Sequence, residues 1–175
     1  MMTQPHSHMT PQIRPAVSAD LTEIERLLRD AGLTTSGVAE IVSATPSHFF
    51  VAETTDGTAA LVAVAGLEVC CDNALLRSVA VDSEWQRRGL GRDLVQRIVC
   101  HAEERGIRAL YLLTMTAERY FPRFGFEAVD RAAVPADIAE TLEFTSACPK
   151  TAVAMRCPLQ LSVERRNDHD IADGR

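Results

Sequence analysis

The sequence predicts a single α/β domain. The chain has 175 residues, of which 46% are hydrophobic and 24% are charged, a length and balance typical of one globular domain. Short strand-like runs alternate with segments in which apolar residues recur at helical spacing. Two glycine-containing turns, Asp56-Gly57 and Gly89-Leu90-Gly91, separate some of these runs. Together these observations favour a sheet flanked by helices.

The first half of the chain predicts a strand, a helix and then an antiparallel run of strands. The expected elements are a strand at 13–17, a helix at 21–31, a weaker helix or loop at 34–42, and strands at 49–53, 59–68 and 74–81. Ser18 or Asp20 is suited to start the first helix, and Gly32 to stop it. The Asp56-Gly57 pair predicts a hairpin, because both residues tolerate positive φ angles.

The second half alternates helices and strands. The expected elements are a helix at 93–105, a strand at 109–113, a short helix ending at 124, a strand at 126–130, a helix at 136–144 and a last strand at 152–155. The first of these helices is amphipathic, and Gly106 ends it. We expect one domain over 13–158, with flexible ends at 1–12 and 159–175, because both ends are polar and lack periodicity.

The segment Gln86-Arg87-Arg88-Gly89-Leu90-Gly91-Arg92 predicts a phosphate-binding turn between a strand and a helix. Its glycines let the backbone approach a ligand closely, and the free N–H groups, the helix dipole and three arginines favour negative charge. The segment lacks the Lys-Ser or Lys-Thr of a P-loop, and its spacing is not the Gly-x-Gly-x-x-Gly of dinucleotide folds. A phosphate ligand of another kind is therefore expected.

Two blocks resemble the GNAT superfamily of acetyl-CoA-dependent N-acetyltransferases. Gln86-x-x-Gly89-x-Gly91 is similar to the pyrophosphate-binding signature of that family, and the later block from Thr114 to Phe126 resembles Asn-x-x-Ala-x-x-Phe-Tyr-x-x-x-Gly-Phe. The resemblance covers 13–158. It implies the GNAT fold, a mixed but mostly antiparallel sheet, flanked by helices, that splays between two parallel strands at 74–81 and 109–113.

The same resemblance implies acetyl-CoA as the acetyl donor and no metal. The pantetheine arm would enter between the splayed strands, and the pyrophosphate would bind the glycine turn. The residues implied to contact the donor are Val79, Ala80, Val81, Gln86, Arg87, Arg88, Gly89, Leu90, Gly91, Arg92, Thr114 and Phe121.

The expected general acid is missing from its usual place. The family often carries a tyrosine shortly before the glycine of its Gly-Phe pair, and Phe121 stands there. Tyr120 is adjacent, but one residue along a helix is a rotation of about 100°. Tyr120 is therefore a candidate acid, against the alternative of a packing or cofactor-contact role.

Candidates for the acceptor side are Glu68 and Arg77. Glu68 could act as a base through water, as could Glu53 or His48. Arg77 stands where many members carry a carboxylate, and it could bind an acceptor carboxylate bidentately; the alternative is a surface arginine. A site without a strong base suits α-amines, with a pKa of ~7.8, better than lysine amines at ~10.4.

Two further resemblances indicate the acceptor. Residues 110–135 look like the acetyltransferase domain of N-acetylglutamate synthases, and 135–155 resemble small GNAT proteins encoded with arsenic-resistance genes. They imply that the acceptor is an amino-acid-like small-molecule amine, such as glutamate or a glutamate-like toxin. Because GNAT proteins are often dimers, the resemblance also implies a homodimer. The alternatives are a protein or peptide N-acetyltransferase, and a non-catalytic module that binds acetyl-CoA or senses a metalloid.

Charge and cysteine content limit partners and location. A net charge of -6 argues against nucleic acid, and no apolar run approaches the ~20 residues of a membrane helix. The five cysteines show no zinc spacing, and no signal-peptide pattern precedes them. We expect a cytoplasmic protein with inert thiols, the alternative being thiols that bind a trivalent metalloid.

Overall fold

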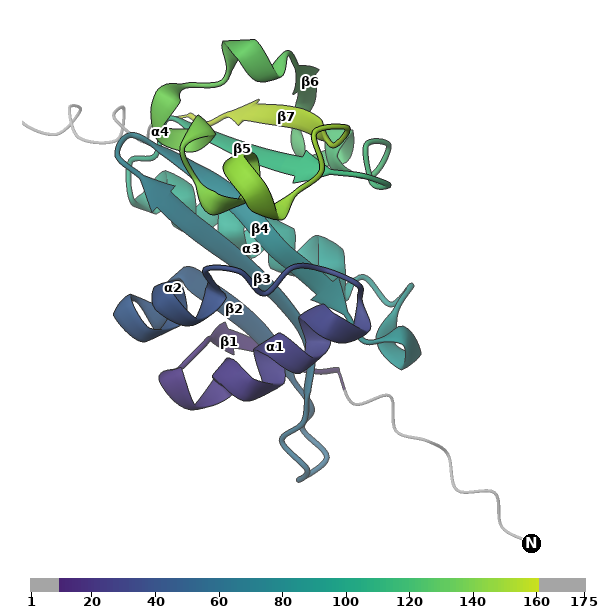
Figure 1. The fold of residues 1–175 in the computed structure, drawn as a ribbon. Coiled ribbons are helices and arrows are strands. Elements are labelled where there is room, and N and C mark those ends of the chain that lie inside the picture. Colours follow the sequence, from purple (N-terminus) through teal and green to yellow (C-terminus); the bar gives the residue numbers. More distant parts are fainter. Residues whose placement is uncertain (1–9, 161–175) are drawn as a thin grey trace, which may run out of the picture.

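A computed structural model describes residues 10–160, and in this part of the chain one seven-stranded sheet carries helices on both faces (Figure 1). The strands are β1 (Gln12–Pro15), β2 (Phe49–Glu53), β3 (Leu61–Cys70), β4 (Asn73–Val81), β5 (Ala109–Thr114), β6 (Glu127–Val129) and β7 (Val153–Pro158), and the helices are α1 (Leu21–Asp30), α2 (Val38–Ala44), α3 (Leu90–Glu104) and α4 (Ala136–Ala139). The strand order is β1-β2-β3-β4-β5-β7-β6. The predicted mixed α/β fold is confirmed.

The sheet opens between β4 and β5, which are the two parallel neighbours among the described strands. These strands pair only over Asn73–Leu75 and Ala109–Tyr111. Beyond Leu75, β4 continues to Val81 and pairs with β3 alone. The predicted splay is therefore present, as a wedge in the middle of the sheet.

Both faces of the central strands are covered, which explains their continuous apolar runs. In β2, Phe49 and Val51 pack against α1 and α2, whereas Phe50 and Ala52 pack on the α3 side. Ile138 of α4 packs on β5 and β7. Full burial of one such large apolar side chain contributes about 1.5–3 kcal/mol, so these contacts hold the two layers of helices against the sheet.

A bulge interrupts β4 beside the wedge. The register against β3 shifts between Val64 and Gly66, and Ser78 takes a left-handed φ of 58°. Gly66 is required on the partner strand, because a Cβ there would lie 2.5 Å from the Phe49 ring. Bulges re-aim the residues that follow them and are frequent next to active sites.

The prediction of a helix over 136–144 is wrong in its second half. α4 ends at Ala139, and a π-helical turn follows at Glu143–Ala147. The Thr141 hydroxyl donates to the Ile138 carbonyl, and such side-chain bonds compete with helical continuation. The break turns Glu143 toward the sheet. In the same way, the helix predicted to end at 124 is only a 3-10 turn over Phe121–Phe124.

The sheet begins at Gln12 and ends at Pro158. Most of the two predicted flexible ends, 1–12 and 159–175, lies outside the described residues, and a single domain over 13–158 stays a prediction. Across residues 10–160, no helix has the length and apolar character needed to span a membrane.

Candidate functional site

The turn between β4 and α3 presents a row of free backbone donors. Arg87 and Gly89 have φ angles of 62° and 85°, and α3 begins at Leu90. Within residues 10–160, no N–H group from Arg87 to Arg92 donates a hydrogen bond, and the first helical bond runs from the Asp93 N–H to the Gly89 carbonyl. Free N–H groups at a helix N-terminus bind anions. The turn therefore fits a phosphate ligand.

Three exposed arginines surround these donors. The Arg88 guanidinium lies 4.7 Å from the centre of the Trp85 ring. Arg92 pairs with its neighbour Asp93 at 3.1 Å. Because Arg87, Arg88 and Arg92 all reach solvent, their charge adds to the attraction for an anion at the turn.

Gln86, Gly91 and Tyr120 hold the turn against the end of β4. The Gln86 side-chain amide donates to the Val81 carbonyl at 3.2 Å. A Cβ added to Gly91 would lie 3.3 Å from the Tyr120 hydroxyl and 3.5 Å from Val81 Cγ2. The Tyr120 hydroxyl thus lies against the first turn of α3, beside the row of donors.

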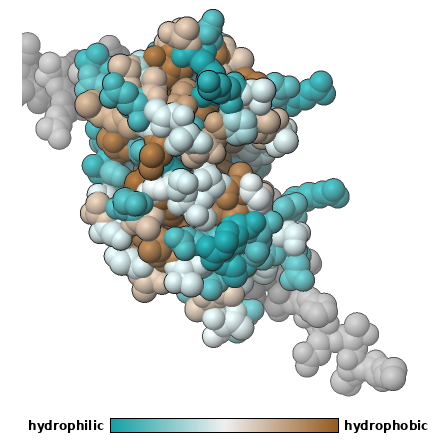
Figure 2. Space-filling model, in the orientation of Figure 1, coloured by the Kyte–Doolittle hydropathy of each residue, from teal (hydrophilic) through white to brown (hydrophobic). Residues whose placement is uncertain are grey.

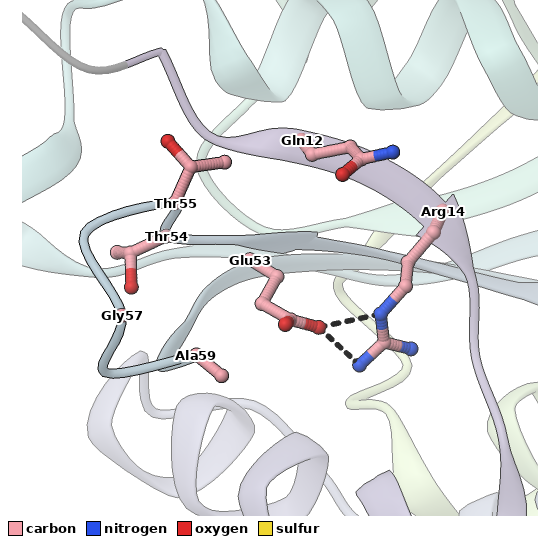
Figure 3. Close-up of a pocket in the computed structure, with 7 residues that line it drawn as sticks. All are labelled: Gln12, Arg14, Glu53, Thr54, Thr55, Gly57 and Ala59. Atoms are coloured by element: carbon pink, nitrogen blue, oxygen red, sulfur yellow. Dashed lines mark hydrogen bonds and ion pairs between the residues drawn. The ribbon is translucent and has the colours of Figure 1, made fainter.

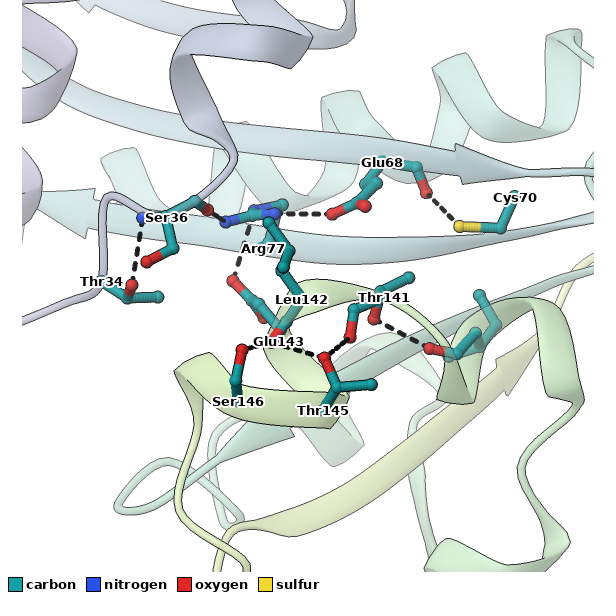
Figure 4. Close-up of polar contacts among 11 residues, drawn as sticks. Thr34, Ser36, Glu68, Cys70, Arg77, Thr141, Leu142, Glu143, Thr145 and Ser146 are labelled. Carbon is teal, nitrogen blue, oxygen red and sulfur yellow. Dashed lines mark hydrogen bonds and ion pairs between the residues drawn. The ribbon is translucent and has the colours of Figure 1, made fainter.

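Arg77 lies at the centre of a buried polar cluster on the other side of β4 (Figure 4). Its Nη1 donates to the Glu68 carboxylate and its Nη2 to the Ser36 carbonyl. Its Nε lies 3.2 Å from Glu143 Oε1, but without the alignment of a hydrogen bond. The alternative of a surface arginine is wrong, because the Arg77 side chain has no exposed area.

The sequence and fold of this chain match those of known proteins. The profile of the acetyltransferase (GNAT) domain matches residues 45–128, which span β2 to β5, the glycine turn and α3. The chain carries a GNAT acetyltransferase domain. An amino-acid acetyltransferase of Mycobacterium tuberculosis is 28% identical over 145 residues, covering 81% of this chain and 82% of that protein.

Other relatives match a shorter stretch or share the fold. The ribosomal protein bS18-alanine N-acetyltransferase of Escherichia coli (strain K12) is 40% identical over 52 residues, so the match spans only 35% of that enzyme and 30% of this chain. The structure of N-acetylglutamate synthase from Neisseria gonorrhoeae superposes with a TM-score of 0.71 at 22% identity, covering 85% of this chain and 35% of that chain. A Mycobacterium tuberculosis protein solved with CoA and NLQ gives 0.72 at 23% identity, covering 86% and 100%.

Two neighbouring aromatic residues of the GNAT domain differ in position, because Phe121 is buried in the core whereas Tyr120 lies beside the glycine turn. Phe121 is only 7% exposed and packs in the core against Phe126, with ring centroids 5.7 Å apart. Burial raises the pKa of Tyr120, although Arg123, stacked 4.4 Å from its ring centre, opposes this. Tyr120 is therefore protonated at neutral pH. Thr114 ends β5, and its hydroxyl accepts from the Ala117 N–H at 2.9 Å.

Two candidate bases of the GNAT domain lie away from Arg77. Glu53 pairs with Arg14 at the edge of the sheet, where both line a pocket of about 290 Å³ (Figure 3). His48 is buried beside His101, with ring centroids 6.0 Å apart, and burial lowers the pKa of both. His48 immediately precedes β2 and Glu53 is its last residue, and β3 separates β2 from β4, the strand that bears Arg77. Glu68 is the predicted base that adjoins the Arg77 cluster.

Three residues of the site were not predicted from the sequence. Glu143 lies in a segment predicted as a helix, and Ser36 lies in a segment predicted as a helix or loop. A polar residue in such a segment is expected to face solvent. Ser78 lies inside an apolar strand, and its buried hydroxyl has no partner within residues 10–160. A serine in such a run is a weak signal for a bulge, whereas nothing in the sequence indicates that Glu143 turns inward.

The cysteines are unpaired thiols. Burial, reinforced by Glu68, raises the pKa of Cys70 to about 12, and burial also raises the pKa of Cys148 and Cys157. Thiols with raised pKa values react poorly. In the part of the chain that the structure describes, no three His, Cys, Asp or Glu side chains gather as a metal site. The raised pKa values favour inert thiols at Cys70, Cys148 and Cys157.

Proposed function

We propose that the chain is an acetyl-CoA-dependent N-acetyltransferase for the α-amino group of a free amino acid or an amino-acid-like toxin. The observation that carries this proposal is the relation to an amino-acid acetyltransferase over 81% of this chain and 82% of that protein. The Neisseria gonorrhoeae relative was solved with coenzyme A and N-acetyl-glutamate. A glutamate-like acceptor, in an arsenic-resistance context, is the finer form of the proposal.

The residues around the glycine turn suit the donor. Acetyl-CoA supplies the acetyl group as a thioester. The free N–H groups from Arg87 to Arg92 would hold its pyrophosphate, and the backbone near Val79, Ala80 and Val81, which pairs with no strand on the β5 side, would bind the amides of the pantetheine arm. Phe121 supports this surface by packing against Tyr120, with ring centroids 5.3 Å apart; the proposal needs no metal.

The acceptor amine must be neutral to attack the thioester. An α-amine with a pKa of ~7.8 is about 14% neutral at pH 7, whereas a lysine amine is neutral in less than about 0.1% of molecules. Glu68, whose side chain is 22% exposed, is the group we assign to accept the proton through water. Tyr120 is protonated and beside the turn, so it would donate to the leaving thiolate or else only contact the donor.

Arg77 is the residue we assign to the acceptor's carboxylate. Its Nε–H is buried and has no aligned hydrogen-bond partner, and a guanidinium binds carboxylates bidentately. Two strands, a loop and the turn after α4 converge on this side chain (Figure 4). An α-carboxylate held here would fix the orientation of the neighbouring α-amine.

An N-terminal amine of a peptide or protein is the second candidate acceptor, because a 52-residue stretch is 40% identical to the bS18-alanine enzyme. The non-catalytic alternative loses its support, because the relatives are named as acetyltransferases. A cytoplasmic location and a homodimer belong to the proposal, and light scattering of the purified protein tests the latter.

The proposal is tested by incubating the protein with acetyl-CoA and separate amines, and by following the release of free thiol. The panel holds amino acids, phosphinothricin-like compounds, polyamines and an alanine-terminated peptide. We expect turnover on at least one amine that carries an α-carboxylate. Turnover confined to polyamines or the peptide would refute the amino-acid acceptor.

A further inference from the structure

The three partners of Arg77 are unequal. Glu68 and Ser36 accept aligned hydrogen bonds from its two terminal nitrogens. Glu143 only approaches Nε, at 3.2 Å, and leaves that N–H without a hydrogen bond. Charge-assisted bonds are strong only when they are short and well aligned. Glu143 is therefore the partner that another carboxylate displaces most easily.

Glu143 also lies on the segment that covers Arg77. Leu142 is 49% exposed, and its Cδ1 would lie 3.3 Å from a Cβ added to Gly37 in the loop before α2. Separate hydrophobic patches lie among neutral and hydrophilic surface on this face in Figure 2. Figure 4 shows the turn that bears Glu143 and the loop that bears Ser36 on either side of the Arg77 guanidinium. An acceptor that reaches Arg77 must pass this cover.

The charges in the cluster are already unbalanced. Glu68 and Glu143 share the single guanidinium of Arg77. Burial raises the pKa of Glu143 despite the opposing effect of Arg77, so the cluster holds its second carboxylate at a cost. An acceptor carboxylate would be the third around one guanidinium, and like charges at this distance disfavour one another. One carboxylate must leave or take up a proton.

We propose that Glu143 is a specificity-determining residue that occupies, from within the chain, the place at Arg77 that an acceptor carboxylate takes. This inference rests on the proposed amino-acid acceptor. Glu143 acts as an internal competitor. It raises the KM for acceptors that carry an α-carboxylate and leaves acceptors without an α-carboxylate unaffected.

The experiment compares the wild type with Glu143→Gln and with Glu140→Gln. The second variant removes an equal charge from an exposed position near the same turn. KM and kcat are measured for the free amino acid that the wild type acetylates best, for its α-carboxamide, and for acetyl-CoA. We expect Glu143→Gln to lower the KM of the amino acid roughly fivefold or more, a coupling of ordinary size between two ligands of one site. The other constants, and all constants of Glu140→Gln, stay unchanged.

A purely structural role predicts a different pattern. An unchanged or higher KM for the amino acid, or an equal change for its carboxamide, would overturn the inference while turnover itself upholds the proposed function. A wild type that acetylates no carboxylate-bearing amine overturns both. If Glu143→Gln does not fold, Glu143→Asp decides in the same measurement, because its shorter side chain draws the carboxylate away from Nε and lowers the KM of the amino acid alone.

Discussion

Replacing Arg77 with methionine tests the polar cluster most directly. Methionine keeps much of the apolar stem but removes the charge, and it leaves Glu143, only 6% exposed, without a counter-ion. Removing one partner of a buried ion pair typically costs about 3–5 kcal/mol, a large part of the ~5–15 kcal/mol that stabilises a domain. Glu143→Gln alone should cost less than about 1 kcal/mol, because Arg77 keeps Glu68 as its partner and burial already disfavours the ionised Glu143 carboxylate.

A double-mutant cycle in urea at pH 7, followed by circular dichroism, measures these terms. We expect Arg77→Met to cost at least ~1.5 kcal/mol less when Glu143 is already glutamine, which is within the usual range for residues in contact. The raised pKa adds a second readout. The penalty of Arg77→Met shrinks as the pH falls and Glu143 takes up a proton, because a neutral carboxyl group needs no counter-ion. A cost of Arg77→Met below ~1 kcal/mol, or additive effects of Arg77→Met and Glu143→Gln at every pH, would refute the pairing of Arg77 with Glu143 in this cluster.

Three further predictions concern the donor turn and the buried histidines. Gly89→Ala should raise the KM for acetyl-CoA, because alanine at φ 85° costs about 1–2 kcal/mol and changes the shape of the turn. The control Gly57→Ala, equally strained at φ 89° in the distant hairpin, should lower stability without changing that KM. Equal effects of the two variants on the KM for acetyl-CoA would contradict the assignment of the turn to the donor. Tyr120→Phe should reduce kcat less than ~10-fold, because the hydroxyl lies against Gly91, whereas a loss of ~10² to 10⁴ in single-turnover experiments would identify Tyr120 as the general acid. Burial lowers the pKa of His48 and His101, so the unfolded state binds more protons and the free energy of unfolding should fall as the pH drops below ~6.5. In urea titrations, the double variant His48→Gln/His101→Gln should show a smaller fall with pH. An unchanged pH dependence would show that other groups cause the fall.

Much of the fold could be predicted because local chemistry determines it. The hairpin at Asp56-Gly57, the apolar runs of β2 to β4 and the end of α3 before Gly106 each depend on residues close in sequence. The glycine turn was predicted for the same reason, since Gln86, Gly89 and Gly91 act on their own backbone and on the adjoining strand.

The acceptor side was harder to predict because its contacts are distant in sequence. Arg77 bonds to Ser36, which is 41 positions away, and no local pattern shows that this arginine is buried. Glu143 turns inward because the helix breaks after Ala139, where the Thr141 hydroxyl donates a hydrogen bond to the Ile138 carbonyl. The bulge at Ser78 depends on the register with β3 and on the space above Gly66, which no single strand specifies.

The most direct test of the whole account is the acetyl-CoA-dependent release of thiol with an amino acid, its α-carboxamide and an alanine-terminated peptide as acceptors. Mass spectrometry of the product identifies the acetylated nitrogen. We predict acetylation on the α-nitrogen of the free amino acid, with a lower kcat/KM for the carboxamide because it cannot pair with Arg77. Acetylation of the peptide or the carboxamide in preference to every free amino acid would contradict the account.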